Sequence, residues 1–117
     1  MPQDLQERLF EFAVRSILFL RTLPDYTEYK VIKYQLIKSS SSSGANYEES
    51  QAGSSRADFN NKVRISLREM RESNYWFRIV KAITTEGISI DELNWLIQES
   101  KELKNILGSI AQKTRKK

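Results

Sequence analysis

The serine run Ser39–Ser43, followed at once by Gly44, is the feature that most constrains how this 117-residue chain folds. By composition the run is typical of a flexible linker, which would divide the chain into two halves. Read at helical spacing, the same stretch places small and polar side chains on one face, where a neighbouring helix can approach closely. That face comprises Gln35, Ser39, Ser42, Asn46 and Glu49. Serine is a middling helix former that competes for backbone hydrogen bonds, so residue types alone leave helix and loop both open.

Four segments of the chain show apolar residues at helical spacing, and no alternating strand pattern interrupts them. Pro24 stops the first segment, Gly53 suits the end of the second, and Ser89 with Glu92 has the spacing of a capping box at the start of the fourth. The pattern predicts an all-α, antiparallel up-down-up-down four-helix bundle. We expect a single domain over residues 1–112, with helices at about 4–22, 27–52, 57–86 and 89–112, and a basic C-terminal tail at 113–117.

The first segment is apolar over a wider arc than one face of a bundle needs, because Phe10, Val14 and Leu18 lie beside its main apolar stripe. One interpretation is a well-buried helix. The other is a helix that also meets another subunit.

The absence of cysteine and histidine excludes most enzyme classes. Without them there is no disulfide framework, no thiolate nucleophile and no side chain that titrates near neutrality or serves as the commonest metal ligand. The chain also lacks the glycine-rich pattern of a phosphate loop. No basic start followed by an apolar run is present, and no apolar stretch approaches 18 residues. We therefore expect a cytoplasmic protein with no cofactor, no metal, no membrane contact and no small-molecule substrate.

Positive charge is concentrated in the third segment and the tail. Residues 53–85 carry seven basic and three acidic groups, residues 86–112 carry two and five, and residues 113–117 carry four and none. One stripe of the third helix, called here the basic stripe, comprises Arg64, Arg68, Arg71, Tyr75 and Arg78. It can contact nucleic-acid phosphates, with the tyrosine available to stack, or it can be a solvated face or pair with the acidic fourth helix. The tail has the same two interpretations, and its cations are Lys113, Arg115, Lys116 and Lys117.

A second apolar line runs along the third helix, about 130° from its core face. It comprises Ile65, Trp76, Ile79 and Ile83, with Glu69 and Glu72 among them. A contiguous exposed patch of this size is unusual on a monomer and predicts an oligomer interface, although Trp76 can also cover the bundle's own core. The two glutamates do not complete a di-iron site, which in bundles of this type requires histidine.

Several short motifs resemble the bacterial four helix bundle protein family, also known as the 23S rRNA intervening-sequence proteins. The match runs from about Phe12 to the end of the chain. The motifs are Leu23-Pro24, Gln35-Leu36-x-Lys38-Ser39, Ser42-x-x-Ala45-Asn46-Tyr47-x-Glu49, Arg56-x-Asp58-Phe59-x-x-Lys62 and Glu69-x-x-Glu72-Ser73-x-Tyr75-Trp76.

The resemblance implies that the serine run is helical, since the family carries this block on its second helix. The implied helix-packing motif is Gln35, Ser39, Ser42, Ala45, Asn46 and Glu49. Family members resemble five-fold barrels of four-helix protomers. A relative is the accessory variability determinant of diversity-generating retroelements, in which a basic barrel engages nucleic acid and reverse transcriptase.

These observations lead to two hypotheses for function. The first is a non-enzymatic bundle that self-assembles, with a homopentamer implied by the resemblance, and presents basic surfaces to RNA, DNA or a nucleic-acid enzyme such as a reverse transcriptase. The second is a protein–protein interaction scaffold with no role in nucleic-acid binding, in which the basic stripe is neutralised inside the assembly.

Overall fold

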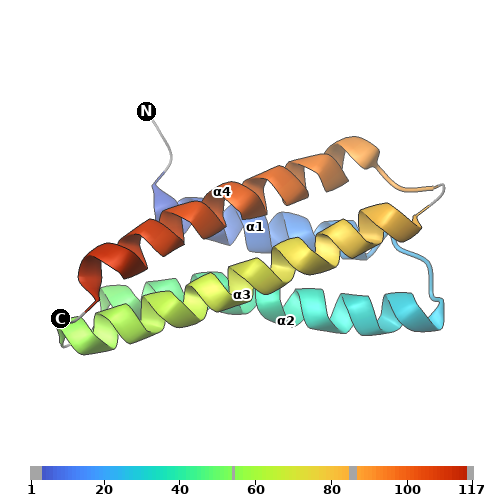
Figure 1. The fold of residues 1–117 in the computed structure, drawn as a ribbon. Helices are drawn as coiled ribbons and strands as arrows, with labels where there is room; N and C mark the ends of the chain where they lie inside the picture. The colour runs from blue at the N-terminus through green and yellow to red at the C-terminus, as the bar shows by residue number, and fades with distance from the viewer. Residues whose placement is uncertain (1–3, 54, 85–86, 116–117) are drawn as a thin grey trace.

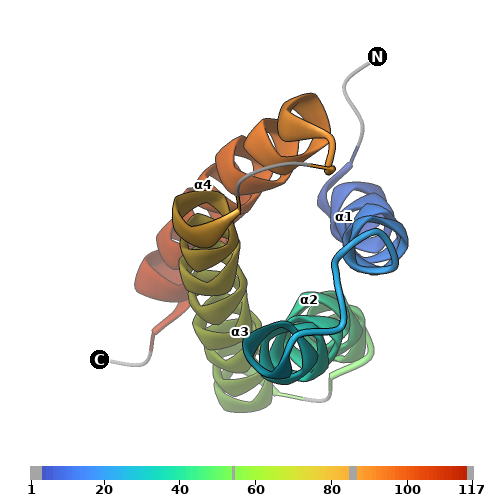
Figure 2. The same cartoon turned by 90° about the vertical axis from the view of Figure 1, so that its right-hand side faces the viewer.

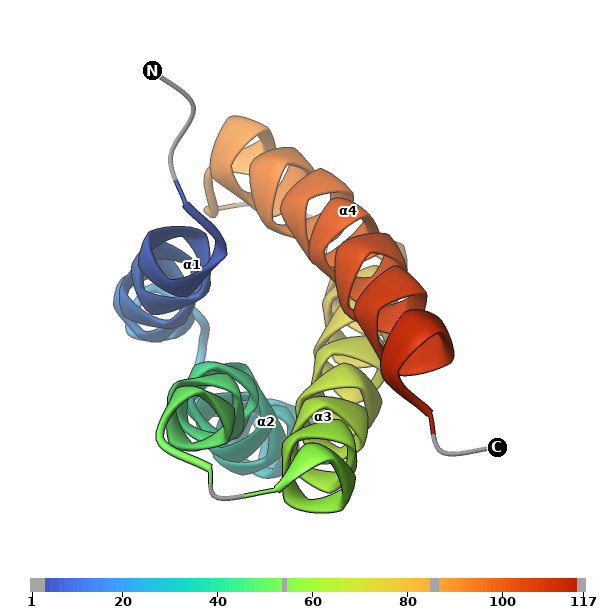
Figure 3. The ribbon, with the colours of Figure 1, turned by 90° about the vertical axis from the view of Figure 1, so that its left-hand side faces the viewer.

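The computed structural model describes residues 4–53, 55–84 and 87–115, and it confirms an all-α four-helix bundle (Figure 1). The helices are α1 (Leu5–Leu20), α2 (Thr27–Gln51), α3 (Arg56–Ile83) and α4 (Ile90–Thr114). Seen from its two ends, the bundle places the helices in chain order around one core, with α1 diagonal to α3 (Figures 2 and 3). Among the described residues, no helix is both long enough and apolar enough to cross a lipid bilayer.

Three of the four helix starts are fixed by side-chain caps. Asp4 accepts a hydrogen bond from the Glu7 amide at 2.9 Å, and Ser55 accepts one from the Asp58 amide at 3.0 Å. Ser89 accepts one from the Glu92 amide at 3.2 Å, which is the start predicted from their spacing. Each cap satisfies an amide that has no partner within its helix, so these residues set where the helices begin.

Three helix ends differ from the sequence prediction by two residues or more. The first helix ends at Leu20 rather than 22. The third helix ends at Ile83 rather than 86, and residues 85–86 lie outside the described part of the chain. The fourth helix continues to Thr114, so Lys113 belongs to its last turn and not to the tail predicted at 113–117. Residues 116–117 also lie outside the described part.

The core is apolar and centred on aromatic rings from opposite helices. Phe12 of α1 meets Phe77 of α3 edge to face, with ring centroids 6.0 Å apart, and Phe19 approaches the same ring at 6.2 Å. The largest fully buried side chains are Leu9, Phe12, Leu20, Leu36, Val63, Met70, Phe77, Val80, Leu93, Leu96, Leu103 and Leu107. All four helices contribute, so none can leave without exposing this core.

The serine run is helical and forms the seam between α2 and α3. The hydroxyl of Ser43 donates to the carbonyl of Ser66 at 2.8 Å, and the hydroxyl of Ser66 donates to the carbonyl of Ser43 at 2.7 Å. One turn earlier on α2, the Ser39 hydroxyl lies 2.8 Å from that of Ser73. Small side chains let the two backbones come close, and the reciprocal bonds satisfy the buried hydroxyls of Ser43 and Ser66.

The face of α2 that packs inside the bundle is rotated about the helix axis from the face predicted from the sequence. Ser39 is buried as expected, but Ser40, Ser43 and Ser50 accompany it. Ser42 and Asn46 are half-buried at the side of the seam and bond to each other, while Gln35 is half-buried and Ala45 and Glu49 are exposed. The cause is Leu36, which must point into the core and thereby turns the positions four and seven residues later inward with it.

Asparagines join α3 to α4 at two levels. The Asn60 amide group donates to the carbonyl of Ala111 at 2.9 Å and to the Thr114 hydroxyl at 3.0 Å. Asn74 donates to the carbonyl of Ile97 at 3.1 Å and to the Ser100 hydroxyl at 3.0 Å. Because these are side-chain bonds to a neighbouring backbone, they fix the register between the two helices.

The contact between α1 and α4 is held by ion pairs. Arg8 makes a two-pronged contact with Glu99 at 3.0 and 2.7 Å and reaches Glu102 at 3.2 Å. Arg15 makes a similar contact with Glu92 at 2.9 and 2.6 Å, and its guanidinium lies 3.4 Å from the ring centroid of Trp95. The hydrogen bonds that Arg15 donates lower the pKa of Glu92 below its ordinary value. The hydrogen bonds that Arg8 donates to Glu99 and Glu102 raise the pKa of Arg8.

We predict that Ser43→Leu destabilises the bundle by about 3 kcal/mol, because the side chain overfills the α2/α3 seam and removes a buried hydrogen bond. Ser109→Leu is the matched control, since Ser109 is exposed on α4. Urea unfolding followed by circular dichroism at one protein concentration measures both. Equal midpoints for the two variants would contradict a close α2/α3 seam.

We also predict that the Arg15–Glu92 pair makes stability depend on pH. The pKa of Glu92 is lowered in the folded state, so its stabilisation is present above the ordinary value of 4.5 and is lost as pH falls through the folded-state pKa. Glu92→Gln is expected to cost about 1 kcal/mol at pH 7, discounted for partial exposure, and to have little effect at pH 3. Asp91→Asn, in the same helical turn, is the control. A Glu92→Gln loss that stays constant from pH 7 to pH 3 would contradict the pairing.

Candidate nucleic-acid interface

A basic groove lies between α3 and α4 near the C-terminal end of the chain. It has a volume of about 550 Å³. The residues that line it are Asn60, Arg64, Leu67, Arg71, Gly108, Ala111, Gln112 and Arg115. Gly108 contributes no side chain to the α4 wall, and a Cβ atom at this position would lie 4.0 Å from Leu67 Cδ1, at ordinary contact distance. Three guanidinium groups therefore border one hollow whose floor is Leu67.

The structure places the four arginines of the basic stripe at the surface of α3. Arg64 and Arg71 line the α3/α4 groove. Arg78 continues that line one heptad further, where Asn74 Oδ1 accepts a hydrogen bond from its Nε at 2.9 Å. Arg68 points further outward, with a side chain 72% exposed.

Tyr75 is the aromatic member of the basic stripe, and its ring is accessible. It is 52% exposed, and the Arg78 guanidinium lies 5.7 Å from its ring centroid. A base could stack on this ring without any displacement of the core, because the ring is not part of the core cluster.

Three of the four carboxylates of α4 are paired with α1. Glu92, Glu99 and Glu102 are the acidic partners of α1 in the ion pairs described above. Within residues 4–53, 55–84 and 87–115, no carboxylate lies within ion-pair distance of Arg64, Arg71 or Arg78. Among the described residues, the carboxylate within ion-pair distance of Arg68 is that of its neighbour Glu69, at 3.7 Å. The positive charge along α3 is therefore not neutralised by the acidic helix in the described part of the chain.

Sequence reasoning treated the basic stripe and the C-terminal tail as separate, and the fold brings part of the tail to the stripe. Arg115 lines the same groove as Arg64 and Arg71. Lys113 is exposed, and its backbone carbonyl accepts a hydrogen bond from Arg56 at 3.3 Å. Lys116 and Lys117 lie outside the described residues.

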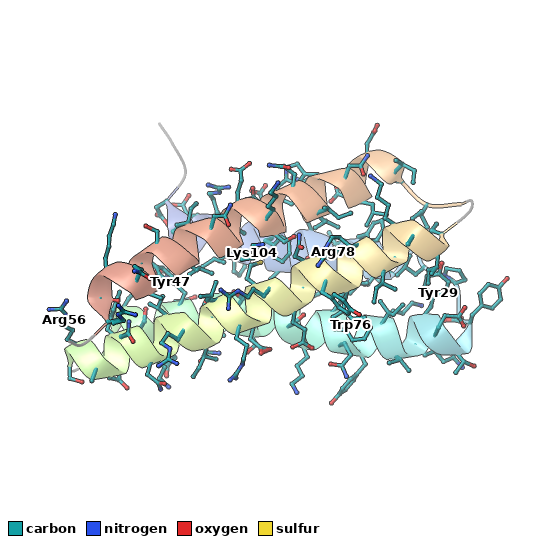
Figure 4. All side chains as sticks on the ribbon, viewed as in Figure 1. Tyr29, Tyr47, Arg56, Trp76, Arg78 and Lys104 are labelled. Carbon is teal, nitrogen blue, oxygen red and sulfur yellow. The ribbon has the colours of Figure 1, made fainter. Side chains whose placement is uncertain are left out.

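The α4 wall of the groove was missed from the sequence. Half-buried Lys104 lies with Arg78 along the seam between α4 and α3 (Figure 4). Lys104, Gly108, Gln112 and Arg115 recur every three or four residues, so they share one face of α4. This spacing, together with a glycine inside a long helix, was the available signal.

The second apolar line on α3 is divided by the fold. Trp76 and Ile79 are partly buried against the core, and Ile65 is half-buried. Glu69 is buried, and Glu72 accepts a hydrogen bond from the Trp76 indole at 3.3 Å. Ile83 remains 42% exposed. Trp76 thus covers part of the bundle's own core while keeping an exposed edge, and the oligomer interface on this line stays a prediction.

No group of three acidic side chains is placed to hold a metal ion among the residues that the structure describes. The polar clusters of the bundle are instead the serine and asparagine seams, whose bonds are interhelical.

Comparison with known proteins agrees with the fold. The chain is similar to a crystal structure of a protein of unknown function from the S23 ribosomal protein family of Bacteroides thetaiotaomicron VPI-5482. The two are 32% identical, with a TM-score of 0.80, over 92% of this chain and 98% of the other. The comparison with curated proteins gave no match.

Residues 3–109 match the family described as 23S rRNA-intervening sequence protein. Neither this description nor that of the similar structure names an enzymatic activity. The family match covers nearly the whole chain, and the similar structure shares the same four-helix fold. The chain therefore belongs to the 23S rRNA-intervening sequence protein family.

Proposed function

We propose that this protein is a non-enzymatic, self-assembling bundle that binds the sugar–phosphate backbone of nucleic acid along α3 and the α3/α4 groove. The observation that carries the proposal is the direction of the α4 carboxylates, which pair with Arg8 and Arg15 of α1. Had these carboxylates faced α3, the basic stripe would have been an internal salt-bridge network. Because they face α1, the guanidinium groups of α3 remain available to an external anion.

The spacing of the groove-side arginines fits a nucleic-acid backbone. Arg64, Arg71 and Arg78 recur every seven residues, so they span about 21 Å along α3 at 1.5 Å per residue. One strand of a nucleic acid rises about 3.4 Å per nucleotide, so this length corresponds to roughly six nucleotides. Guanidinium groups match phosphate oxygens in pairs, and Tyr75 offers a stacking surface that does not depend on base identity.

Self-assembly is the second part of the proposal. A single groove with a few guanidinium groups binds weakly at physiological salt, whereas several copies on one strand raise the overall affinity without any new type of contact. The resemblance of the sequence motifs implies five copies. Exposed apolar side chains on α1 and α2, described below, supply surface that an assembly could bury.

We predict that replacing Arg64, Arg71 and Arg78 with Gln weakens binding to a fluorescein-labelled 20-nucleotide uridine RNA. The loss is expected to be tenfold or more at low salt, and the slope of log K against log salt should become shallower by about 2 units, because each lost phosphate contact removes about 0.7. Fluorescence anisotropy from 50 to 300 mM KCl measures both quantities.

The matched control removes the same charge elsewhere. Arg21, Lys30 and Lys38 are exposed and lie away from the groove, so changing them to Gln should alter affinity and slope much less. If the two triple variants bind alike, the α3/α4 groove is not the binding surface. If the wild type shows no salt-dependent binding at all, the protein–protein scaffold hypothesis is favoured.

For self-assembly, we predict that multi-angle light scattering at 20 µM chain gives a mass well above that of one 13.7 kDa chain. A closed five-membered ring has a mass of about 68 kDa. A single species of 13.7 kDa across 5 to 100 µM would overturn the assembly part of the proposal and leave the groove prediction to stand or fall separately.

A further inference from the structure

Large exposed apolar side chains form a face on α1 and α2, while α3 exposes Tyr75 and Ile83. Phe10, Val14 and Leu18 of α1 are 68%, 40% and 51% exposed, so the well-buried interpretation of these positions is wrong. On α2, Tyr34 and Ile37 are 67% and 44% exposed. The core is already filled from the other side of α1, and these residues have no place in it.

This face contains an apolar groove. It has a volume of about 300 Å³, and its lining includes Phe10, Ala13, Val14 and Ile17 from α1 and Ala45 from α2. Gly44 lies at its base, where a Cβ atom would come within 3.4 Å of Leu9 Cβ, so α1 and α2 approach closely beneath the groove.

The rim of the groove is acidic. Glu7, Glu11 and Glu48 surround Phe10 and Val14 in a wider hollow of about 630 Å³. The negative charge of Asp4 raises the pKa of Glu7, which reflects the density of negative charge at this end. An occupant of the groove must therefore offer apolar side chains flanked by cations.

The chain itself carries such a surface on the outer side of α3. A shallow hollow of about 290 Å³ there is lined by Ile65 and Leu67 together with Arg64, Arg68 and Arg71. Partly buried Trp76 lies further along the same helix. This surface has the opposite charge to the rim of the α1/α2 groove, and the two lie on different helices of the bundle.

We infer that the acidic-rimmed α1/α2 groove of one copy receives the outer face of α3, around Ile65 and Arg68, from a second copy. The contact is heterologous, so each copy uses the groove toward one neighbour and α3 toward the other, and repetition of the contact can close a ring. A symmetric groove-to-groove contact would instead place Glu7, Glu11 and Glu48 against their own equivalents, which like-charge repulsion disfavours. The inference rests on the self-assembly part of the proposed function and specifies its surfaces.

The heterologous contact also divides the work of α3. Ile65 and Arg68 would lie in the interface. Arg64 and Arg71 line both the outer hollow and the α3/α4 groove, so they would lie at the border of the interface, whereas Arg115 lines the α3/α4 groove alone. Assembly and nucleic-acid binding would then use adjacent sides of one helix.

The first test uses two variants, each with one face broken. Phe10→Asp with Val14→Asp alters only exposed positions of the groove, and Ile65→Ser with Arg68→Glu alters the α3 face. Each variant alone should be a monomer by light scattering, with wild-type helix content by circular dichroism. An equimolar mixture should give a one-to-one dimer and nothing larger, because only one intact groove and one intact α3 face remain.

Other results of the mixing experiment overturn the inference. If either double variant keeps the wild-type mass, its face is not the interface. If both are monomers and the mixture stays monomeric, or if one variant forms a homodimer, the two faces do not pair with each other. A monomeric wild type instead overturns the self-assembly part of the proposed function.

The second test distinguishes contact between the groove and α3 from contact between two grooves, because the same substitutions change the assembly constant in opposite directions. Glu7→Gln with Glu48→Gln should weaken assembly about tenfold at 50 mM salt if the groove meets arginines, and the difference should vanish at 1 M salt through screening. Groove-to-groove contact predicts the opposite, since removal of the carboxylates would strengthen it. Sedimentation equilibrium at both salt concentrations measures the assembly constant, and unchanged or tighter assembly at low salt would overturn the inference.

Discussion

The ion pairs between α1 and α4 determine how charge is distributed over the whole bundle. Arg8 and Arg15 take up Glu99 and Glu92 in two-pronged contacts, and Trp95 lies under the second guanidinium. This seam joins the two neighbouring helices whose backbones approach each other least. It also pairs Glu92, Glu99 and Glu102 of α4 with arginines of α1. The α4 carboxylates that could have neutralised the arginines of α3 pair with α1 instead. The arginines of α3 therefore give the molecule a basic side.

Helix α3 is held by a different kind of contact to α2, to α4 and to the core. Ser66 and Ser73 bring it close to α2, Asn60 and Asn74 tie its register to α4, and Phe77 anchors it in the core. These interhelical hydrogen bonds cost little net stability because donor and acceptor are both paired. They also prevent α3 from shifting along its neighbours. A helix held so firmly can present its arginines in a fixed row without relying on flexible loops.

Much of the fold followed from helical periodicity and from a few helix-start and helix-stop residues, such as Ser89 and Pro24. The arginines of the basic stripe could also be placed on one helical face, because 100° per residue is a local property of the chain. The α4 wall of the groove, with Gly108 and Gln112, was missed, since no local pattern indicates which face of α4 meets α3. The rotation of α2 was missed because the burial of Leu36, and not the serines, sets it.

The sequence by itself determined that four amphipathic helices would form, that the chain lacks the thiol and imidazole groups of common catalysts, and that cations would line one face of α3. These properties depend on spacing and composition, which are local. Only the tertiary structure decided which carboxylates meet which arginines, that Arg115 joins Arg64 at one groove, and that Phe10 and Val14 remain outside the core. Those outcomes depend on how each helix is rotated about its axis and which helices are neighbours. The close packing of the whole core determines both.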